Sequence, residues 1–306
     1  MLAAVLLATL VPPVFAASAG QGKANDKPVP EPAAPTESLD PTKPVPFKPP
    51  PADSIPNDDF GKMVKKGEQI FVNTKQNAPQ FVGNNLNCVN CHLDAGRKAD
   101  SSPLWAAYGA YPAYRSKNKH VNTFAERLQG CFKFSMNGKA PPLGDETLVA
   151  LEAYSYWLAT GAPVRQPVQG RGYPKLPVAA RPADYARGEK VYAQNCVLCH
   201  GSNGEGQLSN DKTVFPPLWG PKSFNWGAGM HDIQNAAAFI KANMPLGLGG
   251  TLSDQDAWDV AAFMNSHERP QDPRFKGSVA ETRKQYHNEP TSMYGKTVNG
   301  HVLGGK

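Results

Sequence analysis

The stretches Cys88-Val89-Asn90-Cys91-His92 and Cys196-Val197-Leu198-Cys199-His200 decide the fold of this chain. Each places two cysteines three positions apart, with a histidine directly after the second. This spacing is typical of covalent haem attachment, in which both thiols add to the haem vinyl groups and the histidine becomes the proximal iron ligand. A zinc site would need more ligands close by, and a thioredoxin-like redox pair would need a βαβ pattern that the sequence lacks.

The two motifs predict two covalently bound haem c groups. The alternative is a pair of reducible disulfide or zinc hairpins. In the haem interpretation the cysteines hold the porphyrins and the histidines bind the irons: Cys88, Cys91 and His92 in the first motif, and Cys196, Cys199 and His200 in the second. The chain has five cysteines, so Cys131 is left over as a soft sulfur that can lie near an iron.

The N-terminus predicts export. An apolar run from Leu2 to Leu10 is too short to span a bilayer and is followed by the small residues Ala16 and Ala17. We interpret residues 1–17 as a signal peptide or, because no basic residue precedes the run, as a retained anchor. Covalent haem attachment takes place outside the cytoplasm, so we expect a periplasmic protein with no stable membrane insertion.

Residues 18–57 predict a Pro-rich disordered linker. Eleven prolines fall between Pro28 and Pro56, with few apolar residues between them. Such a segment cannot bury enough surface to fold and prefers an extended conformation. The formal net charge of +6 is lowered by the haem propionates, and the basic residues lack interleaved aromatics, so we expect no nucleic-acid partner.

The remaining chain repeats one plan and predicts an all-α fold of two cytochrome c-like domains in tandem, each with one covalently bound haem c. In each half a predicted helix precedes the haem motif, beginning near Asp58 and near Asp184. Aromatic helices close the halves, over residues 145–160 and from Ser253 onward. We place the parts as follows: an N-terminal domain at 58–162, an interdomain linker at 163–182, a C-terminal domain at 183–269 and an extended tail at 270–306.

The sixth ligand of the second iron is predicted to be Met244. This residue lies before the last helix, at a distance from His200 that is usual for cytochromes c. Met230 and His231 are the alternatives. A thioether raises the reduction potential of the iron, which suits a haem that passes electrons on.

In the first domain the matching position holds Cys131. Met136 and His120 are the alternatives for the iron, and a small buried hydrophobe is the alternative for Cys131 itself. A thiolate ligand stabilises ferric iron and lowers its potential, so two haems with these ligands would form a downhill relay.

The surroundings of Cys131 suggest an anion site. Arg127, Cys131 and Ser135 are four residues apart and share one face if the segment is helical. A guanidinium, a thiolate and a hydroxyl on one stripe suit a small oxyanion, and Arg115 lies among further basic residues nearby. The alternative is an ordinary solvated basic face.

Residues 130–138, with Tyr111–Arg115 and Glu126-Arg127 before them, resemble the dihaem thiosulfate dehydrogenases. Gly170-Arg171-Gly172 and Arg269–Phe275 share the resemblance, which extends from about residue 60 to about residue 300. It implies that two thiosulfate ions are oxidised to tetrathionate. Two electrons then leave through the haems to a small cytochrome c or similar acceptor, and the reverse reaction, tetrathionate reduction, stays open.

The resemblance also implies the roles of individual residues. His92 and Cys131 correspond to the iron ligands at the active site, and His200 and Met244 to those of the electron-exit haem. The residues that match catalytic and substrate-holding positions are Cys131, Arg115, Arg127 and Ser135. Cys131 either takes up a sulfane sulfur covalently or only tunes the iron, and the sequence does not choose between these roles.

The chain departs from the family pattern at two places. Phe134 precedes Ser135, where we associate the family with a basic residue, and Asn243 precedes Met244, where some relatives carry a lysine that exchanges ligands. Redox-linked ligand exchange at the second haem is therefore an open question. Two alternative functions are a non-enzymatic dihaem electron carrier and a haem-thiolate subunit of a sulfur-oxidising complex.

Overall fold

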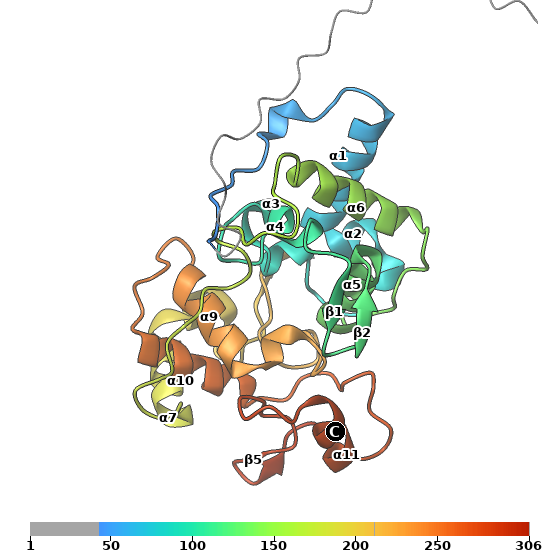
Figure 1. Ribbon diagram of the computed structural model, residues 1–306. Helices are drawn as coiled ribbons and strands as arrows, with labels where there is room; N and C mark the ends of the chain where they lie inside the picture. Colours follow the sequence, from blue (N-terminus) through green and yellow to red (C-terminus); the bar gives the residue numbers. More distant parts are fainter. Residues whose placement is uncertain (1–42, 211, 306) are drawn as a thin grey trace, which may run out of the picture. The chain divides into compact units, whose positions relative to one another are not determined.

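The computed structural model describes residues 43–210 and 212–305, so the predicted signal peptide and most of the Pro-rich linker lie outside the described residues. The described chain is mostly helical, and its short strands pair into three two-stranded antiparallel sheets (Figure 1). Within these residues, every helix is too short or too polar to span a bilayer.

Two long helices form the frame of the first half. Helix α1 (Asp59–Val72) begins at Asp58, whose side chain caps the first turn by accepting a backbone hydrogen bond. Helix α6 (Glu146–Leu158) begins in the same way at Asp145. The helices pack closely at Gly67, where an added Cβ would lie 2.0 Å from a carbonyl oxygen of α6.

The second half repeats this arrangement. Helix α7 (Tyr185–Asn195) begins at the capping residue Asp184, and helix α10 (Asp254–Asn265) begins at the capping residue Ser253. An added Cβ at Gly188 would again lie 2.0 Å from a carbonyl oxygen, here one of α10. The two halves therefore share one helix-packing plan, as the repeated sequence pattern predicts.

The other elements of the two halves are short. In the first half they are η1 (Ala52–Ser54), α2 (Thr74–Asn77), η2 (Pro79–Phe81), η3 (Cys88–Asn90), α3 (Leu93–Gly96), α4 (Leu104–Tyr108), β1 (Ala113–Arg115), β2 (His120–Asn122), α5 (Phe124–Gly130) and η4 (Cys131–Ser135). In the second half they are α8 (Val197–His200), β3 (Gln207–Ser209), β4 (Lys212–Phe215), η5 (Gly229–His231) and α9 (Ile233–Asn243).

Each half has its own apolar core. The first core contains the buried Trp105 and Tyr154, and the second contains Trp258 and Phe263. Met230 is half-buried and packs against both cores. The segment around Met230 is therefore where the two halves meet.

The last part of the predicted linker is ordered against the first half. Val45 forms a parallel bridge with Val168, and the ring of Phe47 lies 5.4 Å from the ring of Trp105. These apolar side chains bury surface that the neighbouring prolines do not. Residues 43–57 therefore differ from the disordered linker that their composition predicts.

The tail also differs from the extended segment that the sequence predicts. It contains helix α11 (Val279–Tyr286) and a hairpin of β5 (Thr297–Val298) and β6 (His301–Val302). Tyr294 and Leu303 are buried against Trp226 of the second half. An eight-residue helix whose apolar partner lies elsewhere in the chain leaves no periodic signal, which explains the wrong prediction.

Candidate active site

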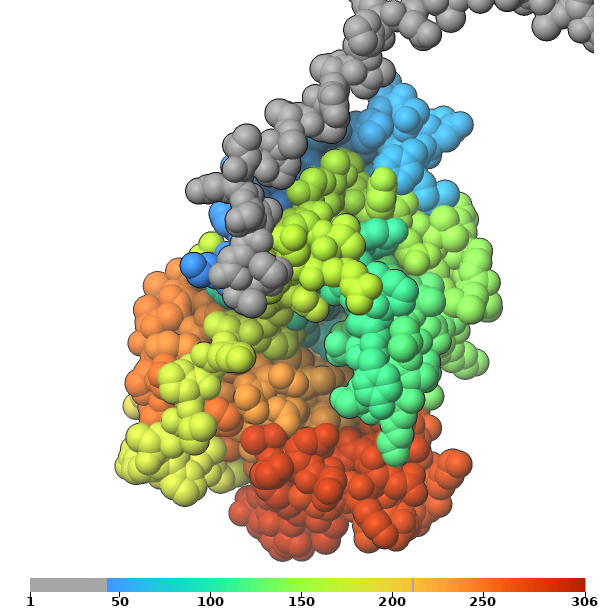
Figure 2. All heavy atoms as spheres, viewed as in Figure 1, coloured from blue at the N-terminus to red at the C-terminus, as the bar shows by residue number. Residues whose placement is uncertain are grey.

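A cavity of about 430 Å³ opens beside the first haem motif. Its wall includes the thiols of Cys88 and Cys91 and the imidazole of His92, together with apolar side chains such as Phe71 and Leu104. Figure 2 shows this face of the molecule hollowed between the green β1–β2 hairpin and the yellow-green interdomain segment. Both cysteines of the motif and its histidine thus face one largely apolar space.

Hydrogen bonds fix the first motif in place. Thr74 Oγ1 accepts from the Cys88 N–H at 3.0 Å and lies 3.3 Å from Cys88 Sγ. His92 Nδ1 lies 2.7 Å from the Ser102 carbonyl oxygen, so Nδ1 carries the proton and donates it. Burial lowers the pKa of His92 to about 4, which keeps the ring neutral. A neutral imidazole with its Nε2 free is the form that binds a metal.

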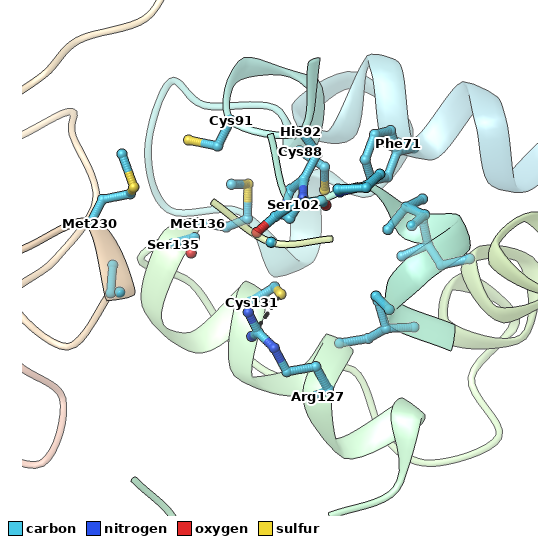
Figure 3. Close-up of a pocket in the computed structure, with 18 of the residues that line it drawn as sticks. Phe71, Cys88, Cys91, His92, Ser102, Arg127, Cys131, Ser135, Met136 and Met230 are labelled. Atoms are coloured by element: carbon cyan, nitrogen blue, oxygen red, sulfur yellow. Dashed lines mark hydrogen bonds between the residues drawn. The ribbon is translucent and has the colours of Figure 1, made fainter. Parts of the chain in front are cut away.

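Cys131 lies across the cavity from His92 (Figure 3). It begins η4, a π-helical turn that directly continues α5. The Arg127 Nη1–H donates to Cys131 Sγ at 3.2 Å, so these two residues share a face as their spacing predicts. Attraction to Cys131 raises the pKa of Arg127 further above its ordinary range, against the opposing effect of burial. Ser135, at the end of the turn, also lines the cavity.

The structure separates the alternatives to Cys131. His120 lies exposed on β2, where its Nε2 is 3.2 Å from Glu126 Oε1, and it does not line the cavity. Met136 does line the cavity and is 4% exposed. Met136 is thus a second sulfur at the cavity, whereas Cys131 is the one that accepts a hydrogen bond from Arg127 (Figure 3).

The charged residues around the cavity all have one sign. They are Arg115, Arg127 and Arg171, and no carboxylate from the described part of the chain lines the cavity. Guanidinium groups bind oxyanions in a planar, two-pronged manner. The cavity is therefore suited to a small, highly charged anion.

Sequence reasoning did not assign to this cavity several lining residues from outside the first domain, among them Arg171, Tyr173 and Met230. Arg171 and Tyr173 come from the predicted interdomain linker, and Met230 comes from η5 in the second half. The one available signal was Gly170-Arg171-Gly172, whose two glycines have positive φ angles of 77° and 74°. Glycine adopts this backbone conformation without strain, so the two glycines indicate a position where the fold requires a positive φ angle.

Comparison with known proteins gives the family. The thiosulfate dehydrogenase of Thiomonas intermedia is 61% identical over 291 residues, which are 95% of this chain and 92% of that protein. The thiosulfate dehydrogenase of Stutzerimonas stutzeri is 56% identical over 84% of this chain and 85% of its own length. The chain belongs to the thiosulfate dehydrogenase family. It is therefore an oxidoreductase that carries haem c.

A solved structure supports the same family. The thiosulfate dehydrogenase TsdBA from Marichromatium purpuratum is 51% identical, with a TM-score of 0.82 over 85% of this chain. The match spans 57% of that solved chain, so this chain corresponds to little more than half of it. Residues 183–264 of this thiosulfate dehydrogenase family member also match the family described as "Cytochrome C oxidase, cbb3-type, subunit III".

The second motif of this family member also fits haem c. His200 Nδ1 lies 2.9 Å from the Pro216 carbonyl oxygen, the same arrangement as at His92. Cys196 packs in the second core together with Met244, which directly follows α9. Two thiols, a histidine oriented by a carbonyl and an apolar wall recur here, and these are the groups that haem c needs.

The alternatives to Met244 have other contacts as well. Both ring nitrogens of His231 have partners: Nδ1 lies 2.6 Å from the Ala228 carbonyl oxygen, and Nε2 lies 3.0 Å from His287. Met230 lines the first cavity and also packs against the second core, as Met244 does. Met244 therefore stays a prediction for the second iron.

Proposed function

We propose that this protein oxidises two thiosulfate ions to tetrathionate in the cavity of its first half. The observation that carries the proposal is the wall facing His92, where Cys131 and Arg127 are hydrogen-bonded at 3.2 Å beside Ser135. The printed names of the relatives at 61% and 56% identity support thiosulfate as the substrate. Tetrathionate as the product is what the resemblance to the dihaem thiosulfate dehydrogenases implies.

The reaction balances without a proton, and an external acceptor takes up the two electrons. Two thiosulfate dianions join through one new bond between their sulfane sulfurs, and two electrons are removed. We propose that His92 and Cys131 would hold the iron of one haem c at the active site, and that His200 and Met244 would hold the iron of a second at the electron exit. When bound, the haems would supply the redox chemistry that takes up the two electrons for an external acceptor.

The arginines address the main obstacle, which is repulsion between the two anions. Unit charges 4 Å apart interact by about 4 kcal/mol at an effective dielectric constant of 20, and two dianions by roughly four times as much, ~16 kcal/mol. Arg115, Arg127 and Arg171 line the cavity without a competing carboxylate from the described residues. Positive charge therefore stands where the anions must meet.

Ser135 and Cys131 have distinct proposed roles. The Ser135 hydroxyl can donate to a sulfonate oxygen and so orient the ion. We propose that Cys131 acts beside the bound substrate and that turnover depends on it. We further propose a periplasmic location and a small cytochrome c as acceptor, since covalent haem attachment requires export.

Turnover on free thiosulfate tests the proposal. Purified holoprotein is mixed with ferricyanide and thiosulfate, and acceptor bleaching and tetrathionate are followed together. Two acceptor electrons consumed per tetrathionate formed support the proposal. No bleaching from protein whose haems are intact and reducible by dithionite refutes it and favours an electron carrier or a complex subunit.

The variant Cys131→Gly sharpens this test. It should lose turnover while both haems stay attached, because attachment uses only the thiols of the two Cys-x-x-Cys-His motifs. Ser266→Gly, a change in the second half away from the cavity, is the matched control for haem content. Substantial turnover by Cys131→Gly would remove Cys131 from the proposed machinery.

A further inference from the structure

A short loop fixes the orientation of the proximal histidine of the first haem motif. The carbonyl oxygen of Ser102 accepts from His92 Nδ1 at 2.7 Å. Asp100 and Ser102 have positive φ angles of 61° and 53°, which non-glycine residues adopt only at an energetic cost. Ser101 between them is fully buried. A loop of this conformation persists only where its surroundings hold it.

The interdomain segment provides part of that support. The Asp100 N–H donates to the Gly170 carbonyl oxygen and the Ser102 N–H to the Gly172 carbonyl oxygen, both at 2.8 Å. Gly170 approaches so closely that an added Cβ would lie 2.6 Å from the Ala99 side chain. The Asp100 carbonyl oxygen of this stretch accepts a hydrogen bond from the second half.

Asn243 of the second half binds that carbonyl. Its Nδ2 donates to the Asp100 oxygen at 3.0 Å and to the Phe239 oxygen at 3.1 Å. The Asn243 side chain is fully buried, and its Oδ1 has no partner among the described residues. A buried amide that leaves one polar atom unpaired is costly, so a role in bonding the two carbonyls explains it better than packing.

The position of Asn243 in the chain gives this contact a function. It is the last residue of α9, and Met244 follows directly. A continuous series of short contacts thus joins Met244, through Asn243 and the Asp100–Ser102 loop, to His92. The Asn243 Nδ2–H thus gives this loop a side-chain hydrogen bond from the second half.

We propose that Asn243 is a positioning residue that couples the two haem sites. By holding the loop that orients His92, it keeps the Nδ1 hydrogen bond short and the ligand strongly donating, which lowers the potential of the first haem. The same side chain anchors the segment that presents Met244. The inference rests on the haem sites of the proposed function.

The variant Asn243→Leu tests the coupling. Leucine has a similar volume but no donor, so the loop loses its bond from the second half. We expect the ferrous-to-ferric ratio of the first haem at a fixed poise to rise roughly fivefold, the equivalent of one lost neutral hydrogen bond. The readout is a spectroscopic redox titration that resolves the two haems, with no substrate present.

Two further variants separate coupling from a general disturbance. Lys241→Ala removes the Nζ hydrogen bonds to the Gly250 and Leu252 carbonyl oxygens, which lie within the second half, and should leave the first haem unchanged. Gly172→Ala strains the loop's other support, since its φ is 74° although its Cβ position is open. It should shift the first haem in the same direction as Asn243→Leu.

The outcomes are distinct. The proposal is supported if the ferrous-to-ferric ratio of the first haem rises in Asn243→Leu and Gly172→Ala but not in Lys241→Ala. If Asn243→Leu changes the redox ratio of the second haem alone, the proposal is overturned. If Asn243→Leu does not fold, an unchanged redox ratio of the first haem in Gly172→Ala overturns it. The readout depends on His92, so it stays valid whether or not Cys131 is the sixth ligand or thiosulfate is the substrate.

Discussion

Replacing Arg127 by methionine should impair turnover strongly while leaving the fold intact. Methionine keeps an unbranched stem but removes the guanidinium, whose Nη1 lies 3.2 Å from Cys131 Sγ. Arg127 forms no ion pair with a carboxylate among the described residues, so its loss leaves no buried carboxylate unpaired. The effect should therefore appear in catalysis and much less in stability.

The structure sets the size of the effect. A hydrogen bond to a charged group contributes about 1.5–3 kcal/mol, which corresponds to a fall in kcat/KM of roughly 10- to 150-fold. Arg127 is one of three arginines at a cavity without lining carboxylates from the described residues, so the other two cannot restore the full charge. The Cys131 sulfur loses a hydrogen-bond donor, and so would the anions at the proposed substrate site.

The assay is the initial rate of ferricyanide reduction across a range of thiosulfate concentrations, with haem content checked by absorbance. Lys139→Met is the matched control because Lys139 is an exposed lysine of the same half outside the cavity, and its kcat/KM should stay within about twofold of the wild type. If Arg127→Met also stays within about twofold, or if Lys139→Met is equally impaired, the assignment of Arg127 to the substrate site is wrong.

Three other predictions concern stability. Gly67→Ala should destabilise the first half by several kcal/mol, because the added methyl would stand 2.0 Å from an α6 carbonyl oxygen, and circular dichroism during heating should show it. Arg187→Ala should lower the denaturation midpoint in denaturant titration, because it removes a 2.7 Å ion pair from Asp259, which is 1% exposed. Acidification from pH 6.5 to pH 4.5 should cost about 2 kcal/mol through His231, since burial, and then the neighbouring His287, lower its pKa to about 3.

The sign of the last effect follows from where the proton binds. Below pH 6.5 His231 takes up a proton in the unfolded chain but not in the folded protein. The contribution of His231 to the free energy of unfolding is therefore full above that pH and falls as the pH drops toward 3. His231→Gln keeps a hydrogen-bond acceptor for His287 and should weaken the dependence of the free energy of unfolding on pH. An unchanged pH dependence would assign the acid sensitivity to other groups. An unchanged melting curve for Gly67→Ala, or an unchanged denaturation midpoint for Arg187→Ala, would likewise contradict the packing argument or the ion-pair argument.

The parts of the site that the sequence predicts are the local ones. Each haem motif is recognised from five consecutive residues. The Arg127–Cys131–Ser135 stripe is recognised from its regular spacing in one helical segment. The helix starts at Asp58 and Asp184 follow from capping chemistry that acts within one turn. Each of these inferences needs only neighbours along the chain.

The parts that the sequence does not predict depend on distant contacts. Tyr173 and Met230 reach the cavity only because the interdomain segment and η5 cross its rim, and neither has a spacing that links it to Cys131. The same holds for the tail, whose Tyr294 finds its apolar partner in Trp226. Contacts of this kind depend on the folded arrangement of the halves and leave no period in the sequence.

The π-helical turn bears on how such a site can arise. The Met136 N–H bonds the Cys131 carbonyl oxygen five residues back, at 2.9 Å, so the turn holds one residue more than an α-helical turn. One inserted codon is enough to create such a turn while the flanking segments keep their packing. We expect that deleting one residue between Cys131 and Ser135 would restore the α-helical pitch and turn the hydroxyl away from the cysteine. In genetic terms, a change of a single codon would be enough to alter which side chains of this segment share a face.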